Sequence, residues 1–207
     1  MRSRRVLAMS VLPALLAASA PALAAGAGPD WPCQQRKVLQ ISPGQVWSGP
    51  PLDSVGNEWR NDRTVADLAR TIAERRTDIE EAESLIARFA QGAGDRRNEQ
   101  LTALAAGMLS IINSERAQIM AGIERYWKRQ RSLAAKIERQ MAELEALPQD
   151  GTPEEAGRRE ELAEIQAWDT RIFQEREQSL AYVCELPVRL EQRAFALARA
   201  IQEHLDR

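Results

Sequence analysis

Cysteine and histidine, which often carry nucleophilic or metal chemistry in proteins, are scarce in this chain. It has two cysteines, Cys33 and Cys184, and one histidine, His204. A Ser-His-Asp or Cys-His arrangement needs a histidine beside the nucleophile, but His204 falls in the expected last turn of the final helix, where it fits a C-terminal cap. The three residues are also too few for a four-ligand zinc site. We therefore expect no catalytic residue and no metal site.

Paired carboxylates, which could act as general acid and base, occur at Glu80-Glu81 and Glu160-Glu161. Both pairs lie in arginine-rich helical segments, where ion-paired solvent faces are their ordinary role. Met108 and Met141 are in step with an apolar helical face, which indicates core positions rather than soft metal ligands. These observations predict a protein that is not an enzyme and holds no cofactor.

Residues 1–24 predict a signal peptide. The parts that indicate it are a basic segment, an apolar run and a cleavage site with small residues: Arg2, Arg4 and Arg5; Val6 to Ala18; and Ala22-Leu23-Ala24. We expect cleavage after Ala24 and a periplasmic product with no transmembrane segment, because the apolar run is too short to span a bilayer comfortably. The adjacent Arg4 and Arg5 leave both the general and the twin-arginine export routes open.

Removal of this segment makes the chain more acidic. Residues 1–24 hold three arginines and no acid, so 25 basic and 30 acidic side chains remain, and the formal charge changes from −2 to −5. Binding of nucleic acid by bulk electrostatics needs a concentrated basic face, and attraction to anionic lipid needs positive charge. We therefore expect no nucleic-acid partner.

An exported chain with two cysteines favours a disulfide between Cys33 and Cys184. This bond would tie the N-terminal segment to the last helix. It closes a loop of about 150 residues, for which the chain-entropy model gives a stabilisation of about 4–5 kcal/mol. The alternative is two separate thiols, with Cys184 as a small buried hydrophobic residue.

The strongest structural signal is a pair of heptad patterns on either side of one turn, Leu147–Pro153. Apolar residues step by three and four on both sides: Ile119, Ile123, Tyr126, Leu133, Ile137, Met141 and Leu144, then Leu180, Val183, Pro187, Leu190, Ala194, Leu197 and Ile201. This spacing buries one seam of a helix against another helix. We predict an all-α fold built on a long antiparallel, coiled-coil-like helical hairpin.

The remaining elements follow from composition and turn signals. Residues 25–63 contain five prolines and three tryptophans and predict an extended N-terminal strap, anchored by its tryptophans. Residues 64–207 predict a three-helix bundle with a protruding hairpin, whose helices cover about 64–91, 95–146 and 152–205. The shorter helix packs on one half of the hairpin, which leaves about 130–168 as a bare coil.

The surface most suited to binding a partner lies where bundle becomes coil. Counting outwards from the turns places aromatic residues together there: Trp59, Tyr126, Trp127, Trp168 and Phe173. With the neighbouring basic side chains, the candidate surface comprises Tyr126, Trp127, Arg129, Arg131, Lys136 and Trp168. Cations beside aromatic rings could bind an acidic partner or a lipid headgroup. A solvent face of paired charges is the alternative.

Two segments resemble known proteins. Asp30-Trp31-Pro32-Cys33-Gln34-Gln35-Arg36-Lys37-Val38, followed by Val46-Trp47-Ser48-Gly49-Pro50, resembles the opening of a group of uncharacterised secreted helical proteins of alphaproteobacteria. The resemblance implies an envelope location and brings no catalytic residue. Leu101-Thr102 is similar to the first half of the Leu-Thr-x-x-Gln signature of small envelope stress chaperones.

A lone two-helix projection buries little, so a partner chain or a second copy could complete it. We therefore predict a non-enzymatic periplasmic scaffold or adaptor that binds an envelope protein, or another copy of itself, through the hairpin. The alternative is a periplasmic holdase-type chaperone whose helical faces shield unfolded clients.

Overall fold

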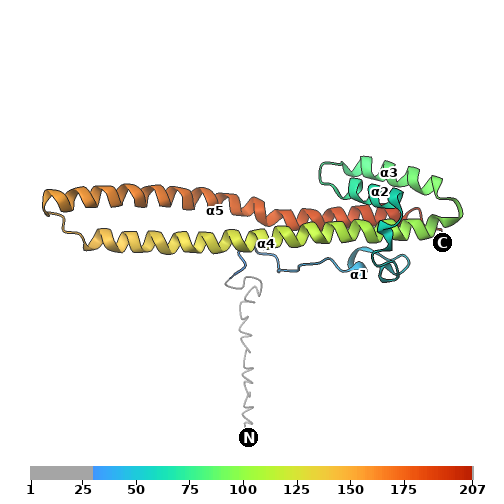
Figure 1. Cartoon of the computed structure of the whole chain (residues 1–207), viewed down its shortest axis with the longest axis horizontal. Coiled ribbons are helices and arrows are strands. Elements are labelled where there is room, and N and C mark those ends of the chain that lie inside the picture. Colours follow the sequence, from blue (N-terminus) through green and yellow to red (C-terminus); the bar gives the residue numbers. More distant parts are fainter. Residues whose placement is uncertain (1–29, 207) are drawn as a thin grey trace, which may run out of the picture.

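The computed structural model describes residues 30–206 and contains no β-strand in that range. The expected signal peptide and residues 25–29 of the strap lie outside the described residues. The helices are α1 (Pro43–Val46), α2 (Arg63–Ala73), α3 (Ile79–Gly92), α4 (Arg97–Ala146) and α5 (Pro153–Gln202), with three short 3-10 turns, η1 (Leu52–Ser54), η2 (Glu58–Arg60) and η3 (Gly94–Arg96). The predicted all-α hairpin is confirmed: α4 and α5 lie side by side and antiparallel (Figure 1).

The hairpin forms because a strong helix-start signal lies in the turn between the two heptad patterns. Thr152 caps α5: its hydroxyl accepts from the backbone N–H of Glu155 at 3.3 Å, and the Glu155 carboxylate accepts from the N–H of Thr152 at 2.7 Å. Pro153, which follows the cap, has the φ that a first helical turn needs. Each long helix has 50 residues. At 1.5 Å per residue, each helix is about 75 Å long.

The helix expected over 64–91 is wrong as a single element, because α2 and α3 form a short hairpin. Glu74 leaves the helical conformation, with ψ at 131°. The carbonyls exposed at the end of α2 have partners: Arg193 donates to the carbonyl oxygens of Ile72, at 2.6 Å, and of Thr77, at 2.7 Å. The Thr77 hydroxyl donates to the carbonyl of Thr71 at 2.8 Å. An arginine of α5 therefore stabilises the helix end.

This break also sets the direction in which α2 packs on α4. The amide of Gln100 donates to Asp62 at 3.3 Å, and Arg75 pairs with Glu115 at 2.8 Å, so α2 runs alongside α4 in the same direction. One end of the molecule is therefore a four-helix bundle rather than a three-helix one. We call this part, α2 and α3 with residues 97–116 and 187–202, the bundle. Residues 117–186 project beyond α2 and α3 as the distal coil (Figure 1).

The core of the bundle consists of apolar side chains. Those with no exposed surface include Ile72, Ile86, Leu101, Leu104, Ile112, Leu190, Leu197 and Ile201. Trp59 belongs to this core, so its expected place beside Tyr126 is wrong. A Cβ atom built at Gly107 of α4 would lie only 2.9 Å from the Trp59 ring. Glycine at position 107 thus leaves the space that the indole fills.

The strap is extended only up to Ser42, which begins α1 through a capping box with Gln45. The 3-10 turns η1 and η2 follow and bury Leu52 and Trp59 against α4. Gly56, between the two turns, has a φ of 51°, and this left-handed conformation separates η1 from η2. The strap is therefore part of the folded core over most of its described length.

Candidate interaction surface

The disulfide fixes the start of the strap where the bundle meets the distal coil. Cys33 and Cys184 are joined, with their Cα atoms 5.5 Å apart, as predicted. Trp31 and Cys33 are buried beside Met120 and Ile123 of α4. The cystine thus stands at the centre of a second, small apolar cluster outside the bundle.

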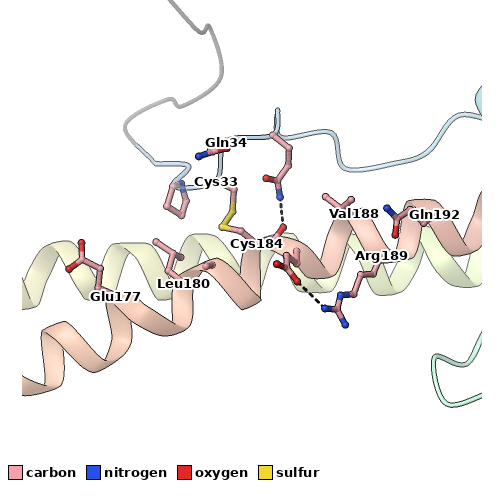
Figure 2. Close-up of a pocket in the computed structure, with 12 residues that line it drawn as sticks. Cys33, Gln34, Glu177, Leu180, Cys184, Val188, Arg189 and Gln192 are labelled. Carbon is pink, nitrogen blue, oxygen red and sulfur yellow. Dashed lines mark hydrogen bonds and ion pairs between the residues drawn. A yellow bond between two sulfur atoms is a disulfide. The ribbon is translucent and has the colours of Figure 1, made fainter.

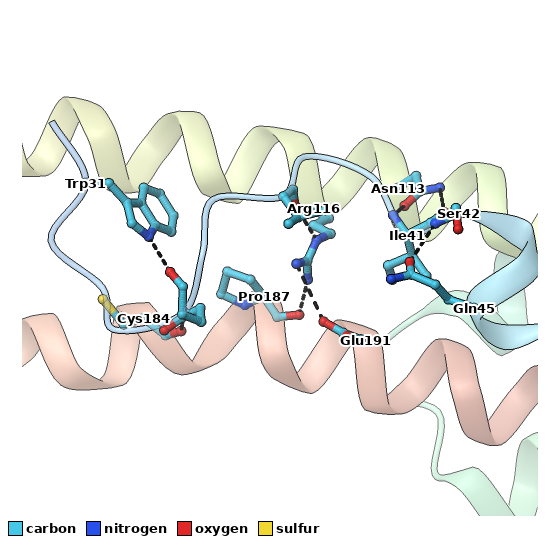
Figure 3. Close-up of polar contacts among 11 residues, drawn as sticks. Trp31, Ile41, Ser42, Gln45, Asn113, Arg116, Cys184, Pro187 and Glu191 are labelled. Atoms are coloured by element: carbon cyan, nitrogen blue, oxygen red, sulfur yellow. Dashed lines mark hydrogen bonds and ion pairs between the residues drawn. The ribbon is translucent and has the colours of Figure 1, made fainter. Parts of the chain in front are cut away.

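Side chains of α4 hold the next part of the strap through its backbone. Asn113 exchanges two hydrogen bonds with Ile41: it accepts from the backbone N–H at 2.7 Å and donates to the carbonyl at 3.0 Å. Arg116, which is buried, donates to the carbonyls of Val38, at 2.9 Å, and Pro187, and lies 3.6 Å from Glu191 (Figure 3). Burial lowers the pKa of Arg116, against the opposing charge of Glu191. This network joins the strap, α4 and α5 at one position along the hairpin.

A shallow hollow of about 610 Å³ lies between the strap and α5 beside the disulfide (Figure 2). Pro32, Leu180 and Val188 give it apolar walls. On its rim, Arg189 donates to Glu185 at 2.9 Å, and Glu177 is exposed. The hollow therefore offers apolar contact but no arrangement of acid, base and nucleophile.

Three of the predicted surface residues make contacts within the chain. The Tyr126 hydroxyl donates to the carbonyl of Arg176, and burial raises the pKa of Tyr126. Arg131 pairs with Asp30 of the strap at 2.6 Å, and Lys136 pairs with Asp169 at 2.8 Å. These contacts hold the strap and the two long helices together.

The other three predicted residues differ in exposure. Trp168 has 59% of its surface exposed, and the guanidinium of Arg171 lies 5.9 Å from its ring centre. Arg129 is exposed and Trp127 is half-buried. The six residues share one region of the coil, but Trp168 faces solvent instead of completing an aromatic cluster.

The seam of the distal coil contains polar side chains that apolar periodicity could not predict. Gln140 and Lys136 of α4 both donate to Oδ2 of Asp169, each at 2.8 Å. Gln130 donates to the carbonyl of Phe173 at 2.7 Å. The hydrogen bond from Lys136, followed by that from Gln140, lowers the pKa of Asp169. Within the described chain, the buried Oε1 atoms of Gln130 and Gln140 have no hydrogen-bond partner.

Met141, expected in the seam, is 48% exposed because its neighbour Gln140 takes the inward position. The seam therefore steps from Ile137 to Gln140 to Leu144. A heptad search finds a glutamine at an inward position only if polar residues are counted as well as apolar ones.

Besides Met141 of α4, the large exposed apolar side chains of the distal coil lie on α5. Ile165, Trp168 and Tyr182 are 42%, 59% and 74% exposed. Together with half-buried Ile172 they follow one three-and-four spacing, which places them on a single face of the helix. We call these four residues the α5 stripe.

Neither a metal site nor a membrane span is found in the part of the chain that the structure describes. No group of three or more His, Cys, Asp and Glu side chains within residues 30–206 is placed to hold a metal ion. No helix of that range is long and apolar enough to cross a membrane. His204 lies just beyond the end of α5, with its N–H donating to the carbonyl of Ile201 at 3.2 Å.

Comparisons with known proteins add no family to this description. No protein-family profile, curated protein or solved structure matches the chain. The resemblance of residues 30–38 to secreted helical proteins therefore stays a prediction.

Proposed function

We propose that the protein is a non-enzymatic periplasmic scaffold or adaptor, which binds a protein partner through its distal coil. The observation that carries this proposal is the α5 stripe. Large apolar side chains such as Trp168 and Tyr182 lie in solvent at regular helical spacing on an element that extends far beyond the bundle. Exposed apolar surface with charged neighbours is typical of protein interaction sites.

The anchoring of the coil supports the same proposal. The disulfide, Arg116 and Asn113 tie the base of the coil to the strap. A helical hairpin held rigidly at one end presents its faces in a fixed geometry, which lowers the entropic cost of binding. A disulfide between cysteines 151 positions apart also fits an oxidising compartment, which supports the proposed periplasmic location.

The test is photo-crosslinking in intact cells. A photoreactive amino acid replaces Trp168 in one variant and Arg88, an exposed residue of α3, in a control. We expect a discrete protein adduct from position 168 and little or none from position 88. Equal labelling from both positions, or no adduct from either, would contradict the proposal.

A holdase chaperone is the second candidate, and the observation that favours it is the high exposure of Tyr182 and Phe195, at 74% and 50%. Apolar side chains on a helical surface can shield unfolded clients. This alternative predicts that the oxidised protein suppresses aggregation of a reduced model substrate at stoichiometric ratios, and that Tyr182→Ser weakens this effect. A fixed adaptor predicts no suppression.

A further inference from the structure

One side of the hairpin is covered by α2 and α3 in the bundle (Figure 1). Glu115 of α4 pairs at 2.8 Å with Arg75, which lies just after α2. Leu186 of α5 lines a groove together with Ile79, the first residue of α3. Glu115 and Leu186 therefore mark the covered side of the two long helices. Residues seven positions apart lie on the same side of a coiled coil, so this side can be followed into the distal coil.

The same side continues beyond α2 and α3 as two rows of side chains. On α4, Arg129 and Lys136 follow the covered glutamate by two and three heptads. On α5, Ile172 and Ile165 precede the covered leucine by two and three heptads. These two isoleucines belong to the α5 stripe, so the stripe lies on the side that α2 and α3 cover in the bundle.

Contacts within the chain place both rows on one side of the coil and the strap on the other. Glu143 and Arg158, one heptad further toward the tip in each row, pair at 2.7 Å. The strap contacts α4 at a different heptad position, where Asp30 pairs with Arg131 at 2.6 Å. Within residues 30–206, the side covered by α2 and α3 in the bundle is therefore open in the distal coil.

This open side is apolar along α5 and basic along α4. Its basic residues are exposed and follow one three-and-four spacing: Arg125, Arg129, Lys136 and Arg139. Lys136 is paired with Asp169, whereas the three arginines form no salt bridge within residues 30–206. Glu175 adds one exposed acid on the α5 side, so the open side stays positive overall. We call the α5 stripe and these four basic residues the open face.

We propose that the partner presents an amphipathic helix with an acidic flank, which lies on the open face and continues the layer that α2 and α3 form. This inference rests on the proposed function and names the kind of partner. The apolar side chains of that helix pack on the α5 stripe, and its carboxylates pair with the arginines of α4. The charge of the open face therefore selects an acidic helix over a basic one.

The shape of the open face favours a helix as the occupant. Large side chains at three-and-four spacing form a ridge that packs into the groove of another helix. The elements that cover the equivalent side in the bundle, α2 and α3, are themselves helices. From Ile165 to Tyr182 the α5 stripe extends over about 26 Å, which a helix of about 18 residues covers. An interface of this size is small, so we expect a dissociation constant in the micromolar range.

Two synthetic peptides of about 18 residues serve as probes. Both carry the same apolar heptad stripe, and the flanking positions are glutamate in one peptide and lysine in the other. Fluorescence anisotropy measures their binding to the exported, oxidised protein. We expect the glutamate peptide to bind at least about tenfold more tightly than the lysine peptide, with a preference that falls as salt is added.

A matched pair of charge reversals tests the open face itself. Arg129→Glu should raise the dissociation constant of the glutamate peptide about fivefold or more, because an attractive contact becomes a repulsive one. The control, Lys128→Glu, makes the same charge change at the neighbouring exposed position, which lies outside the open face. This variant should keep the dissociation constant within about twofold. Trp168→Ser should weaken the binding of both peptides, because it removes apolar contact area.

Equal binding of the two peptides, binding of neither, or equal effects of Arg129→Glu and Lys128→Glu would overturn the acidic-helix proposal. A discrete protein adduct from position 168 in cells, together with no binding of the glutamate peptide, would leave the adaptor function standing and remove only this inference. An adduct that joins position 168 to a second copy of this chain would make that copy the occupant and would also overturn the proposal.

Discussion

The bundle and the distal coil use the same two helices but fill their seams differently. In the bundle, inward residues such as Leu104, Ile112 and Leu197 are apolar and have no exposed surface. Between residues 124 and 186, the buried side chains are Gln130, Gln140 and Asp169. Apolar burial stabilises, whereas polar seam residues fix register at a cost in stability. The bundle therefore supplies most of the apolar burial that holds the fold together, and the coil is packed more weakly.

The largest expected effect concerns the disulfide at the junction of the two regions. Replacement of Cys33 and Cys184 by serine should lower the free energy of unfolding by about 4–5 kcal/mol, because a long loop is no longer closed in the unfolded chain. Urea unfolding measures the change. Reduction of the unmodified protein is the matched control and should give a similar loss. A loss below about 1 kcal/mol would mean that the strap and Arg116 hold the junction without the bond.

A matched pair of leucine-to-alanine substitutions compares the packing of the two seams directly. Leu104→Ala in the bundle should cost about 3 kcal/mol, because it leaves a cavity in a closed core. Leu133→Ala in the distal coil should cost about 1 kcal/mol, because Leu133 is only half-buried. Chemical denaturation followed by circular dichroism measures both. Equal costs would break the distinction between a stabilising bundle and a weakly packed coil.

Replacement of a polar seam residue by an apolar one should stabilise the coil. Gln130→Leu removes a buried amide whose Oε1 has no partner and should raise the free energy of unfolding by about 1 kcal/mol. Gln174→Leu, at an exposed position of α5, is the control and should change it by less than about 0.5 kcal/mol. A loss of stability in Gln130→Leu would show that the bond to the Phe173 carbonyl outweighs the unpaired oxygen.

Acid should weaken the coil through Asp169. Because Lys136 and Gln140 lower the pKa of this carboxyl in the folded state, its contribution is present above the unfolded pKa of about 4 and is lost as the pH falls through the lower folded value. The coil should therefore melt at lower temperature as the pH drops below about 4. Thermal melting of Asp169→Asn, which cannot titrate at this position, should show a shallower acid dependence. The same pH profile in both proteins would refute this role.

The hairpin and the disulfide were predictable because their signals are local or unique in the sequence. Thr152 and Pro153 mark the start of α5, and Cys33 has only Cys184 as a partner. The break after α2 was not predictable, because the carbonyls of Ile72 and Thr77 are capped by Arg193, more than 100 residues away.

The sequence predicted that the six residues of the candidate surface share one region of the coil, but it did not predict their contacts. Periodicity counts apolar residues, so it assigned Met141 to the seam and overlooked Gln140, whose partner Asp169 comes from the other helix. Trp59 was misplaced because α2 runs parallel to α4, which brings the indole to Gly107. Contacts between distant segments, rather than local pattern, decide these positions.

Hydrogen exchange along the two long helices tests the central claim most directly. We expect amides of residues 130–146 and 153–175 to exchange much faster than those of 97–116, because the coil opens without the bundle. Uniform exchange along α4 would contradict the division of the molecule into a stabilising bundle and a weakly packed coil.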